Sequence, residues 1–521
     1  MDYSEREDKK KRVDSFSPDQ LPLPVVLLLA FAIGVVLIIP CFWQPYVPAG
    51  DLSSHVYNAW LGGQIQSGAI DGFTITSQWM NTLGDRMLAF LLPRVGPNLA
   101  EQIVAAITVE IFFWGSFALI SAANPHRPWS FMPILAVIAY GWIFHMGFLN
   151  FILSAGICLF VLALLWDPTA RKLGGAALLL AIALVAHPMP PIWALSIALY
   201  LLVFKKLPES YRMFLPLAVA ALMVLGAWVV WTQLPANFVW DYLTSLDVPA
   251  FITGAHQLML FDQKYLIPAA GFVLLWFWML ANRVDRGGVL KDPTFHVWLL
   301  HIPALFVLPA SIQFTGYEHS ATYIPHRIAM WGAVMFFVMA AQASRREGVT
   351  RTTGIIAAIF FSFLFADYQA FNRVERQVEL LFQDLTIHDR AIATIIDQDA
   401  RINALGHVAD RACIGHCMSY ADYEPITGQF RIQKEPGNTW VAPDMGKAQE
   451  VEQGAYVVLP DAAPIYAACA CPDQPTVFCL RKFEAGQRVC SSSRQISFRI
   501  WGEEEPEVQP SSAPPGSSSG K

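Results

Sequence analysis

Asp51 and His55 are the first residues along the chain whose types and spacing suggest chemistry. They lie four positions apart in the stretch PAGDLSSHVYNAWLGG, so a helix beginning after Asp51 would place them on one face. A carboxylate can serve as a general base, and a neighbouring imidazole can assist or orient it. The alternative is that Asp51 is only the N-cap of that helix, which is a common role for aspartate. Asp51 and His55 are therefore our candidate catalytic residues.

A second group of polar residues is expected at the same depth as Asp51. Arg327 lies at the edge of a hydrophobic segment, and its planar guanidinium suits a phosphate, although it could also extend to lipid headgroups. Tyr323 and His326 flank it as candidate donor-binding residues. Further candidate polar residues are Asp85, His145, His187, Glu318 and His319. If a divalent cofactor such as Mn²⁺ or Mg²⁺ takes part, its candidate ligands are Asp51 and His55 with His187 or His145.

Long hydrophobic segments must position these residues. The 521-residue chain is 55% hydrophobic and 15% charged, and its apolar residues are concentrated in runs long enough to cross a bilayer. The predicted fold class is a polytopic α-helical membrane protein with a small C-terminal α+β domain. About eleven spans are predicted, at 22–42, 99–123, 129–144, 148–166, 173–187, 190–204, 213–232, 265–282, 294–313, 325–343 and 352–371.

The basic residues predict the orientation of these spans. Lysine and arginine residues are concentrated before the first span and in every second loop, which marks those segments as cytoplasmic. The predicted parts are a cytoplasmic tail (1–20), a membrane domain (21–371) with a large external loop (43–98), a cysteine-rich periplasmic domain (372–501) and a disordered tail (502–521). The expected location is the inner membrane of a bacterium. The net charge of −6 gives no sign of nucleic-acid binding.

The region after residue 372 is predicted to be a small mixed domain held by disulfides. An apolar stripe predicts a helix over 372–401, and the runs TGQFRIQ, GAYVVLP and RQISFRIW predict short strands. Six of the eight cysteines fall in this domain, which suggests up to three disulfides in an oxidising compartment. The alternative is a metal site, because CIGHC places His416 between two thiols. The candidate disulfide cysteines are Cys413, Cys417, Cys469, Cys471, Cys479 and Cys490.

The membrane region resembles the GT-C superfamily of integral membrane glycosyltransferases. The resemblance rests on the many spans and on the long loop after the first span, GDLSSHVYNAWLGGQIQSGAIDGF, in which Asp51 stands at the place of the family's acidic residue. In this loop many members of the family have a second acidic residue next to the first. This sequence differs, since His55 follows Asp51 instead. The resemblance implies an inverting transferase that moves a sugar from a polyprenyl-phosphate donor to a glycan, lipid or protein acceptor. Asp51 would be the base and Arg327 the phosphate clamp.

Two other functions remain open from the sequence. One is a lipid or sugar transporter or flippase, which would also combine many spans with polar groups. Such proteins tend to place ionisable groups near the midplane of two related halves, and no internal repeat is evident here. The other is a non-catalytic envelope assembly protein that acts through its cysteine-rich domain.

Overall fold

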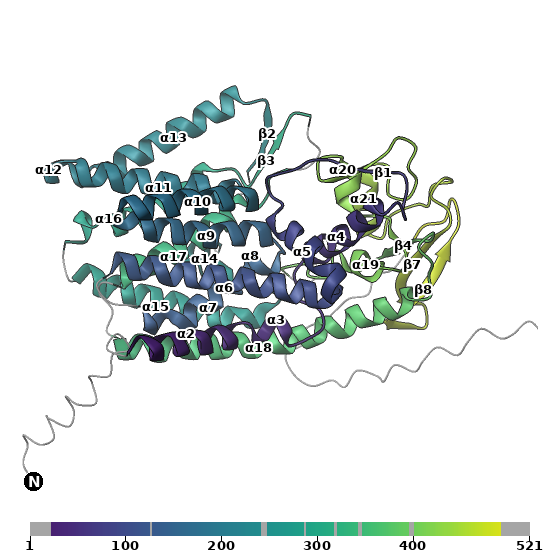
Figure 1. Cartoon of the computed structure of the whole chain (residues 1–521), viewed down its shortest axis with the longest axis horizontal. Helices are drawn as coiled ribbons and strands as arrows, with labels where there is room; N and C mark the ends of the chain where they lie inside the picture. The colour runs from purple at the N-terminus through teal and green to yellow at the C-terminus, as the bar shows by residue number, and fades with distance from the viewer. Residues whose placement is uncertain are drawn as a thin grey trace, which may run out of the picture.

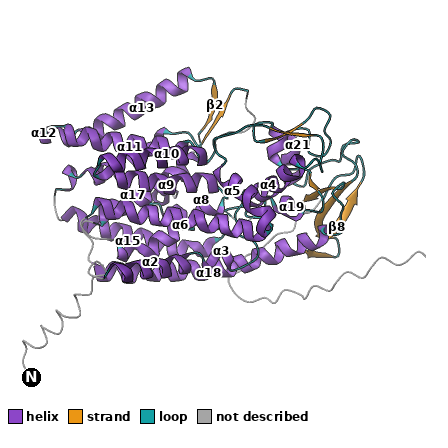
Figure 2. Ribbon diagram, viewed as in Figure 1, coloured by secondary structure: helices purple, strands orange, loops and turns teal. Residues whose placement is uncertain are grey.

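The computed structural model describes residues 22–124, 128–240, 247–285, 288–316, 320–341, 346–394 and 401–490. These parts of the chain are mostly helical, with short strands near the C-terminus (Figure 2). Long helices lie side by side in a bundle, and the shorter elements of 52–95 and 390–483 gather at one end of it (Figure 1).

Six helices in the described ranges are long and apolar enough to cross a membrane. They are α6 (Pro97–Ala123), α9 (Leu149–Trp166), α11 (Met189–Lys206), α13 (Leu215–Gln233), α15 (Leu266–Asp285) and α18 (Arg346–Phe382). Further bundle helices are α2 (Leu23–Leu37), α3 (Ile39–Phe42), α7 (Met132–Ala139), α8 (Trp142–His145), α10 (Ala170–Ala186), α16 (Pro293–Val307) and α17 (Ile324–Ala340). The chain therefore has the architecture of a multi-pass membrane protein.

Small residues allow the central helices to approach closely. A Cβ added at Gly115 of α6 would lie 2.4 Å from the Gly156 carbonyl oxygen of α9. A Cβ at Gly156 would lie 2.7 Å from the Phe112 Cα. Close backbone contact of this kind stabilises helix pairs where lipid removes the hydrophobic driving force. Helix α17 is buried along most of its length and forms the middle of the bundle.

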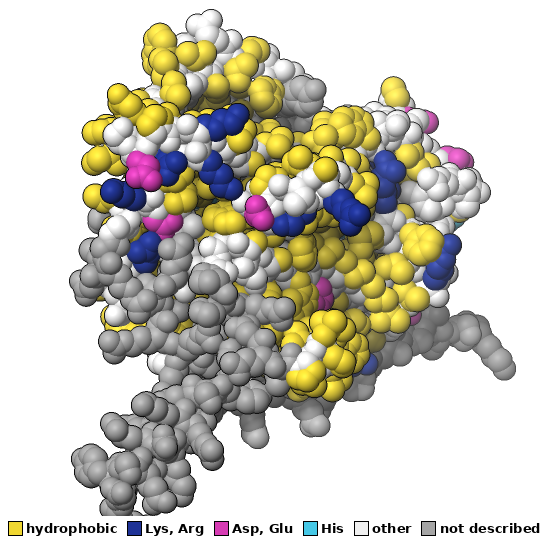
Figure 3. Space-filling view, turned by 60° about the vertical axis from the view of Figure 1, so that its left-hand side comes forward, with side chains coloured by type: hydrophobic (Ala, Val, Ile, Leu, Met, Phe, Trp, Pro, Cys, Tyr) yellow, Lys and Arg dark blue, Asp and Glu magenta, His cyan; other side chains and the backbone are white. Residues whose placement is uncertain are grey.

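The outer helices present apolar side chains outwards. Of the side chains of α13, only Ala227 is buried, and the rest of this apolar helix is exposed or partly exposed. Figure 3 shows hydrophobic side chains over wide areas, with Lys and Arg in separate groups. An apolar surface of this extent fits contact with lipid.

One predicted span ends earlier than expected. Helix α16 ends at Val307, and β3 (Ser311–Phe314) pairs antiparallel with β2 (Ala236–Val239) where the prediction continued the helix to 313. The cause is Pro309, because the residue before a proline is disfavoured in helical conformation. Leu308 is accordingly extended, with φ −90° and ψ 139°.

Helix α18 passes through the predicted boundary at residue 372. It runs unbroken from the bundle to Phe382, where the shorter elements lie (Figure 1). The predicted helix over 372–401 is wrong at Arg390–Ala393, which form strand β4, while residues 395–400 lie outside the described residues. Strand β4 forms hydrogen bonds to a neighbouring strand on each side. This pairing outweighs the helical periodicity of its apolar residues.

A four-stranded sheet follows in the order β5-β4-β7-β8. Strand β4 is parallel to β5 (Met418–Ser419) and β7 (Ile465–Cys471), and β7 is antiparallel to β8 (Gln474–Phe483). Of the predicted strands, TGQFRIQ contributes β6 (Ile432–Lys434), GAYVVLP forms only an isolated bridge from Val457 to Arg488, and RQISFRIW lies outside the described residues.

The prediction of up to three disulfides among these six cysteines is confirmed, and the structure gives the pairing that the sequence left open. They join Cys413 to Cys417, Cys469 to Cys490 and Cys471 to Cys479. The alternative metal site in CIGHC is wrong, because both of its thiols are in a disulfide.

The loop over 43–98 folds together with the C-terminal region. It contains α4 (Leu52–Gln66), β1 (Phe73–Ile75) and α5 (Leu83–Val95), and β1 pairs antiparallel with β6. Both segments lie at the same end of the bundle (Figure 1). The remaining helices of the C-terminal region are α19 (Val408–Ala412), α20 (Tyr423–Thr427) and α21 (Met445–Glu452).

Candidate functional site

Asp51 lies where α4 begins, and the turn after α8 fixes its backbone. The Asp51 amide donates to the Met146 carbonyl at 3.1 Å, and the Gly50 amide donates to the His145 carbonyl at 2.8 Å. Gly147 permits this contact, because a Cβ there would lie 2.4 Å from the Asp51 nitrogen. Asp51 holds the N-cap position, yet its side chain accepts no capping hydrogen bond. The carboxylate is 32% exposed and is accessible to a ligand.

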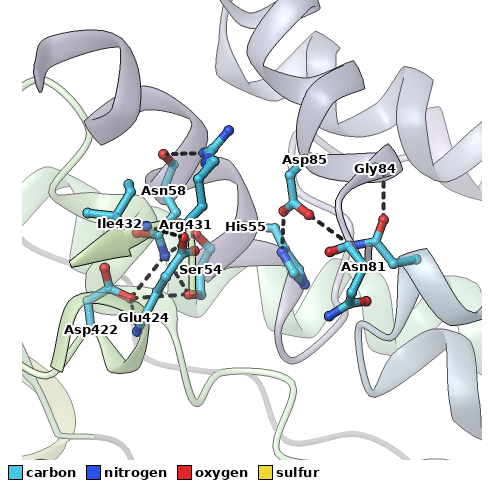
Figure 4. A network of polar contacts seen from close by, with 11 residues as sticks. Ser54, His55, Asn58, Asn81, Gly84, Asp85, Asp422, Glu424, Arg431 and Ile432 are labelled. Atoms are coloured by element: carbon cyan, nitrogen blue, oxygen red, sulfur yellow. Dashed lines mark hydrogen bonds and ion pairs between the residues drawn. The ribbon is translucent and has the colours of Figure 1, made fainter. Parts of the chain in front are cut away.

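His55 pairs with Asp85, which comes from α5. The His55 Nδ1 lies 2.7 Å from Asp85 Oδ1 (Figure 4). Asn150 Nδ2 donates to Asp85 Oδ2 at 2.8 Å. Burial opposes the imidazolium, but the charge of Asp85, with a smaller effect of Asp51, raises the pKa of His55 to about 9. Burial likewise opposes the Asp85 carboxylate, but His55 lowers its pKa. Both groups are therefore charged at neutral pH.

His407 is a site residue that the sequence analysis missed. Its Nε2 lies 3.7 Å from Asp51 Oδ1, and its Nδ1 lies 3.1 Å from Asp410 Oδ2. The other Asp410 oxygen accepts a hydrogen bond from the Ser419 hydroxyl. Burial opposes the charge, but Asp410 and Asp51 raise the pKa of His407 to about 10.

A buried acidic group lies on the other side of α4. Asp422 Oδ1 accepts from Asn58 Nδ2 at 3.0 Å and from the Ser54 hydroxyl at 3.4 Å (Figure 4). Burial, with the nearby Asp410 and Glu424 charges, raises the Asp422 pKa well above its ordinary value. Burial also raises the pKa of Glu424 to about 7. These hydrogen bonds join α4 to the C-terminal region.

Arg327 lies within an aromatic pocket. Its guanidinium carbon is 4.5 Å from the centre of the Phe148 ring and 4.6 Å from that of Phe151. Its Nη1 lies 3.4 Å from His187 Nε2, while its buried Nε has no hydrogen-bond partner. Among the described residues, no carboxylate lies within ion-pair distance of this guanidinium, although Asp51 is near enough to interact with it electrostatically.

His326 belongs to a separate aromatic cluster. Its ring stacks on the Trp142 ring with 4.2 Å between the ring centres, and its centre lies 4.6 Å from that of the His256 ring. Its buried Nδ1 has no hydrogen-bond partner among the described residues. The centre of the Tyr323 ring lies 5.2 Å from that of Trp142 and 5.7 Å from that of Phe148. Tyr323 therefore connects this cluster with the Arg327 pocket. Burial, assisted by the Asp51 charge, raises the pKa of Tyr323.

The other candidate polar residues are placed differently. His145 is fully buried between the Gly141 carbonyl and the Tyr368 hydroxyl, each at 3.1 Å, so its ring stabilises the bundle. Its backbone, and not its ring, reaches the Asp51 region. Glu318 and His319 lie outside the described residues.

The proposed metal ligands do not form a metal site. No group of three or more histidine, cysteine, aspartate or glutamate side chains in the described part of the chain is arranged to hold a metal. His55 is bound to Asp85, and His187 faces the cation of Arg327. As the described residues are arranged, these side chains therefore do not fit a Mn²⁺ or Mg²⁺ ion.

The comparisons with known proteins add no identification. No family model, curated protein or solved structure matches this chain.

Proposed function

We propose that the protein is an inverting membrane glycosyltransferase that uses a polyprenyl-phosphate-linked sugar. The acceptor would be a hydroxyl group on a glycan, lipid or protein at the outer face of a bacterial inner membrane. Arg171 and Lys172 lie in the first turn of α10, and Lys205 and Lys206 lie in the last turn of α11. These helix ends lie at the end of the bundle away from α4 (Figure 1), which supports this orientation. The proposal extends the GT-C resemblance to the side chains of the site.

The observation that carries this proposal is the buried Arg327 guanidinium, which has no carboxylate partner in the part of the chain that the structure describes. A buried charge is costly unless it is compensated, so this cation favours a bound anion. Its position near the end of a bundle helix suits a phosphate whose hydrocarbon chain remains in the bilayer. A polyprenyl phosphate combines these two features.

Asp51 is the proposed general base. The acceptor oxygen would attack the anomeric carbon as its proton passes to the Asp51 carboxylate, and the bond from that carbon to the phosphate oxygen would break. Arg327 would stabilise the charge that develops on the leaving phosphate. His55 is already protonated through Asp85, so it would contribute positive charge rather than accept the proton.

The test follows release of polyprenyl phosphate from a panel of lipid-linked sugars by protein in nanodiscs. Asp51→Asn should lower release by at least about 100-fold, because proton transfer by a positioned base contributes that much. Asp167→Asn is the matched control, since Asp167 follows the C-terminal end of α9 and its side chain is 92% exposed.

Each outcome has a clear meaning. Release by wild type and Asp167→Asn that is lost in Asp51→Asn supports the proposal. Equal release by all three proteins would remove Asp51 from the chemistry. No release from any donor by folded wild type would contradict the enzyme and favour a transporter or assembly role.

A further inference from the structure

His407 lies between two carboxylates that come from distant parts of the sequence. One ring nitrogen is 3.1 Å from Asp410 Oδ2 and the other is 3.7 Å from Asp51 Oδ1. Asp410 is itself held by the Ser419 hydroxyl on β5. Both nitrogens of the ring therefore face carboxylate oxygens, which fixes the orientation of the imidazole.

The segment that carries His407 is anchored to the bundle. The next helix, α19, contains Arg411, which forms buried ion pairs with Glu101 of α6 and Glu375 of α18. The Cys413–Cys417 disulfide follows this helix directly. The helix that follows His407 is thus tied to the bundle by two buried ion pairs, although it lies in the C-terminal region.

We propose that the C-terminal region completes the transferase site, with His407 as the positioning residue that holds the Asp51 carboxylate. This inference rests on the proposed function and assigns the C-terminal region a direct part in it. The backbone of Asp51 is fixed by the turn after α8, but its side chain receives no capping hydrogen bond. The His407 ring supplies the ion-pair contact to the Asp51 carboxylate. Asp410 in turn orients the His407 ring, as carboxylates commonly orient histidines.

The positioning role has a kinetic signature. His407→Gln should lower kcat for polyprenyl phosphate release between about 10- and 100-fold and leave the donor KM nearly unchanged, since the phosphate is held by Arg327 and not by His407. The acidic limb of the pH profile should also move to higher pH, because a positive charge beside Asp51 is lost. The charged and titratable groups that act on His407 are Asp410, Asp51 and Glu452, and the Tyr423 ring packs against it.

A matched control separates this role from a general effect on folding. His388→Gln changes an exposed histidine on the same side of the bundle and should leave kcat, KM and the pH profile unchanged. A parallel loss of kcat and of folded protein in His407→Gln, with the acidic limb unmoved, would show a structural role and overturn the proposal.

A measurement without turnover keeps this inference distinct from the proposed function. Histidine NMR titration of labelled protein in nanodiscs, assigned with His407→Gln, should show the His407 pKa falling by about one unit in Asp51→Asn. A shift in a protein that releases no polyprenyl phosphate would overturn the transferase and support the pairing. An unchanged His407 pKa would overturn the pairing, whether or not the protein is active.

Discussion

Arg411 provides the most quantitative prediction, because it is buried between two carboxylates from the bundle. Its Nη2 lies 2.9 Å from Glu101 Oε2, and its Nη1 donates to Glu375 Oε2. One such contact corresponds to an attraction of about 6 kcal/mol at an effective dielectric constant of about 20, which the cost of burying the charges largely offsets. Arg411→Met removes the attraction but leaves both carboxylates buried. We therefore expect the free energy of unfolding to fall by about 3–5 kcal/mol.

Denaturant unfolding in detergent micelles measures this change, with the fluorescence of the 17 tryptophans as the signal. Arg481→Met is the matched control, since Arg481 is exposed on β8, and it should change the unfolding free energy by less than about 0.5 kcal/mol. The triple variant Arg411→Met, Glu101→Gln and Glu375→Gln removes all three charges and should recover most of the lost stability. Equal stability of Arg411→Met and Arg481→Met would refute the reasoning.

Three further predictions concern helix packing, a charged pair and the disulfides. Gly156→Val should destabilise the bundle by about 1–3 kcal/mol, while Gly174→Val, with open space around it, should change thermal stability little. Folding raises the His55 pKa from 6.5 to about 9, so the stabilisation by this pair is complete below pH 6.5 and is lost as the pH rises through 9. Asp85→Asn should therefore lower the unfolding free energy near pH 7 by about 2 kcal/mol and weaken its decline above pH 8; an unchanged pH dependence would contradict the pairing. Alkylation of denatured, unreduced protein followed by mass spectrometry should modify two cysteines only, Cys41 and Cys158.

The local sequence pattern predicts those parts of the fold that depend on hydrophobic length and on turn residues. Helix α4 spans Leu52–Gln66 and begins directly after Asp51, as predicted from the aspartate at this position. The pattern failed at β4, where residues with helical periodicity pair with two distant strands. It also missed the β7–β8 hairpin, whose alternation is weakened by small residues in IYAACAC.

The candidate site was also only partly predictable, because its residues come from segments that are distant in the sequence. Asp51, Asp85 and Arg327 were candidates because their residue types stand out near the ends of hydrophobic segments. Their partners could not be identified, since His407 reaches Asp51 only after the loop over 43–98 and the C-terminal region have folded together. The local signal that could have shown His407 is the GHVAD stretch, in which an imidazole and an acid lie three residues apart.

The most direct test of the central claim is the affinity of the protein for polyprenyl phosphate. Binding to wild type and to Arg327→Gln in nanodiscs can be compared by photo-crosslinking with a diazirine-bearing polyprenyl phosphate, with thermal unfolding as the check on folding. We predict that Arg327→Gln binds at least about tenfold more weakly and unfolds at the same or a higher temperature, because it removes a buried charge that no carboxylate among the described residues pairs with. Equal affinity in the two folded proteins would contradict the assignment of Arg327 to the phosphate and, with it, the proposed transferase.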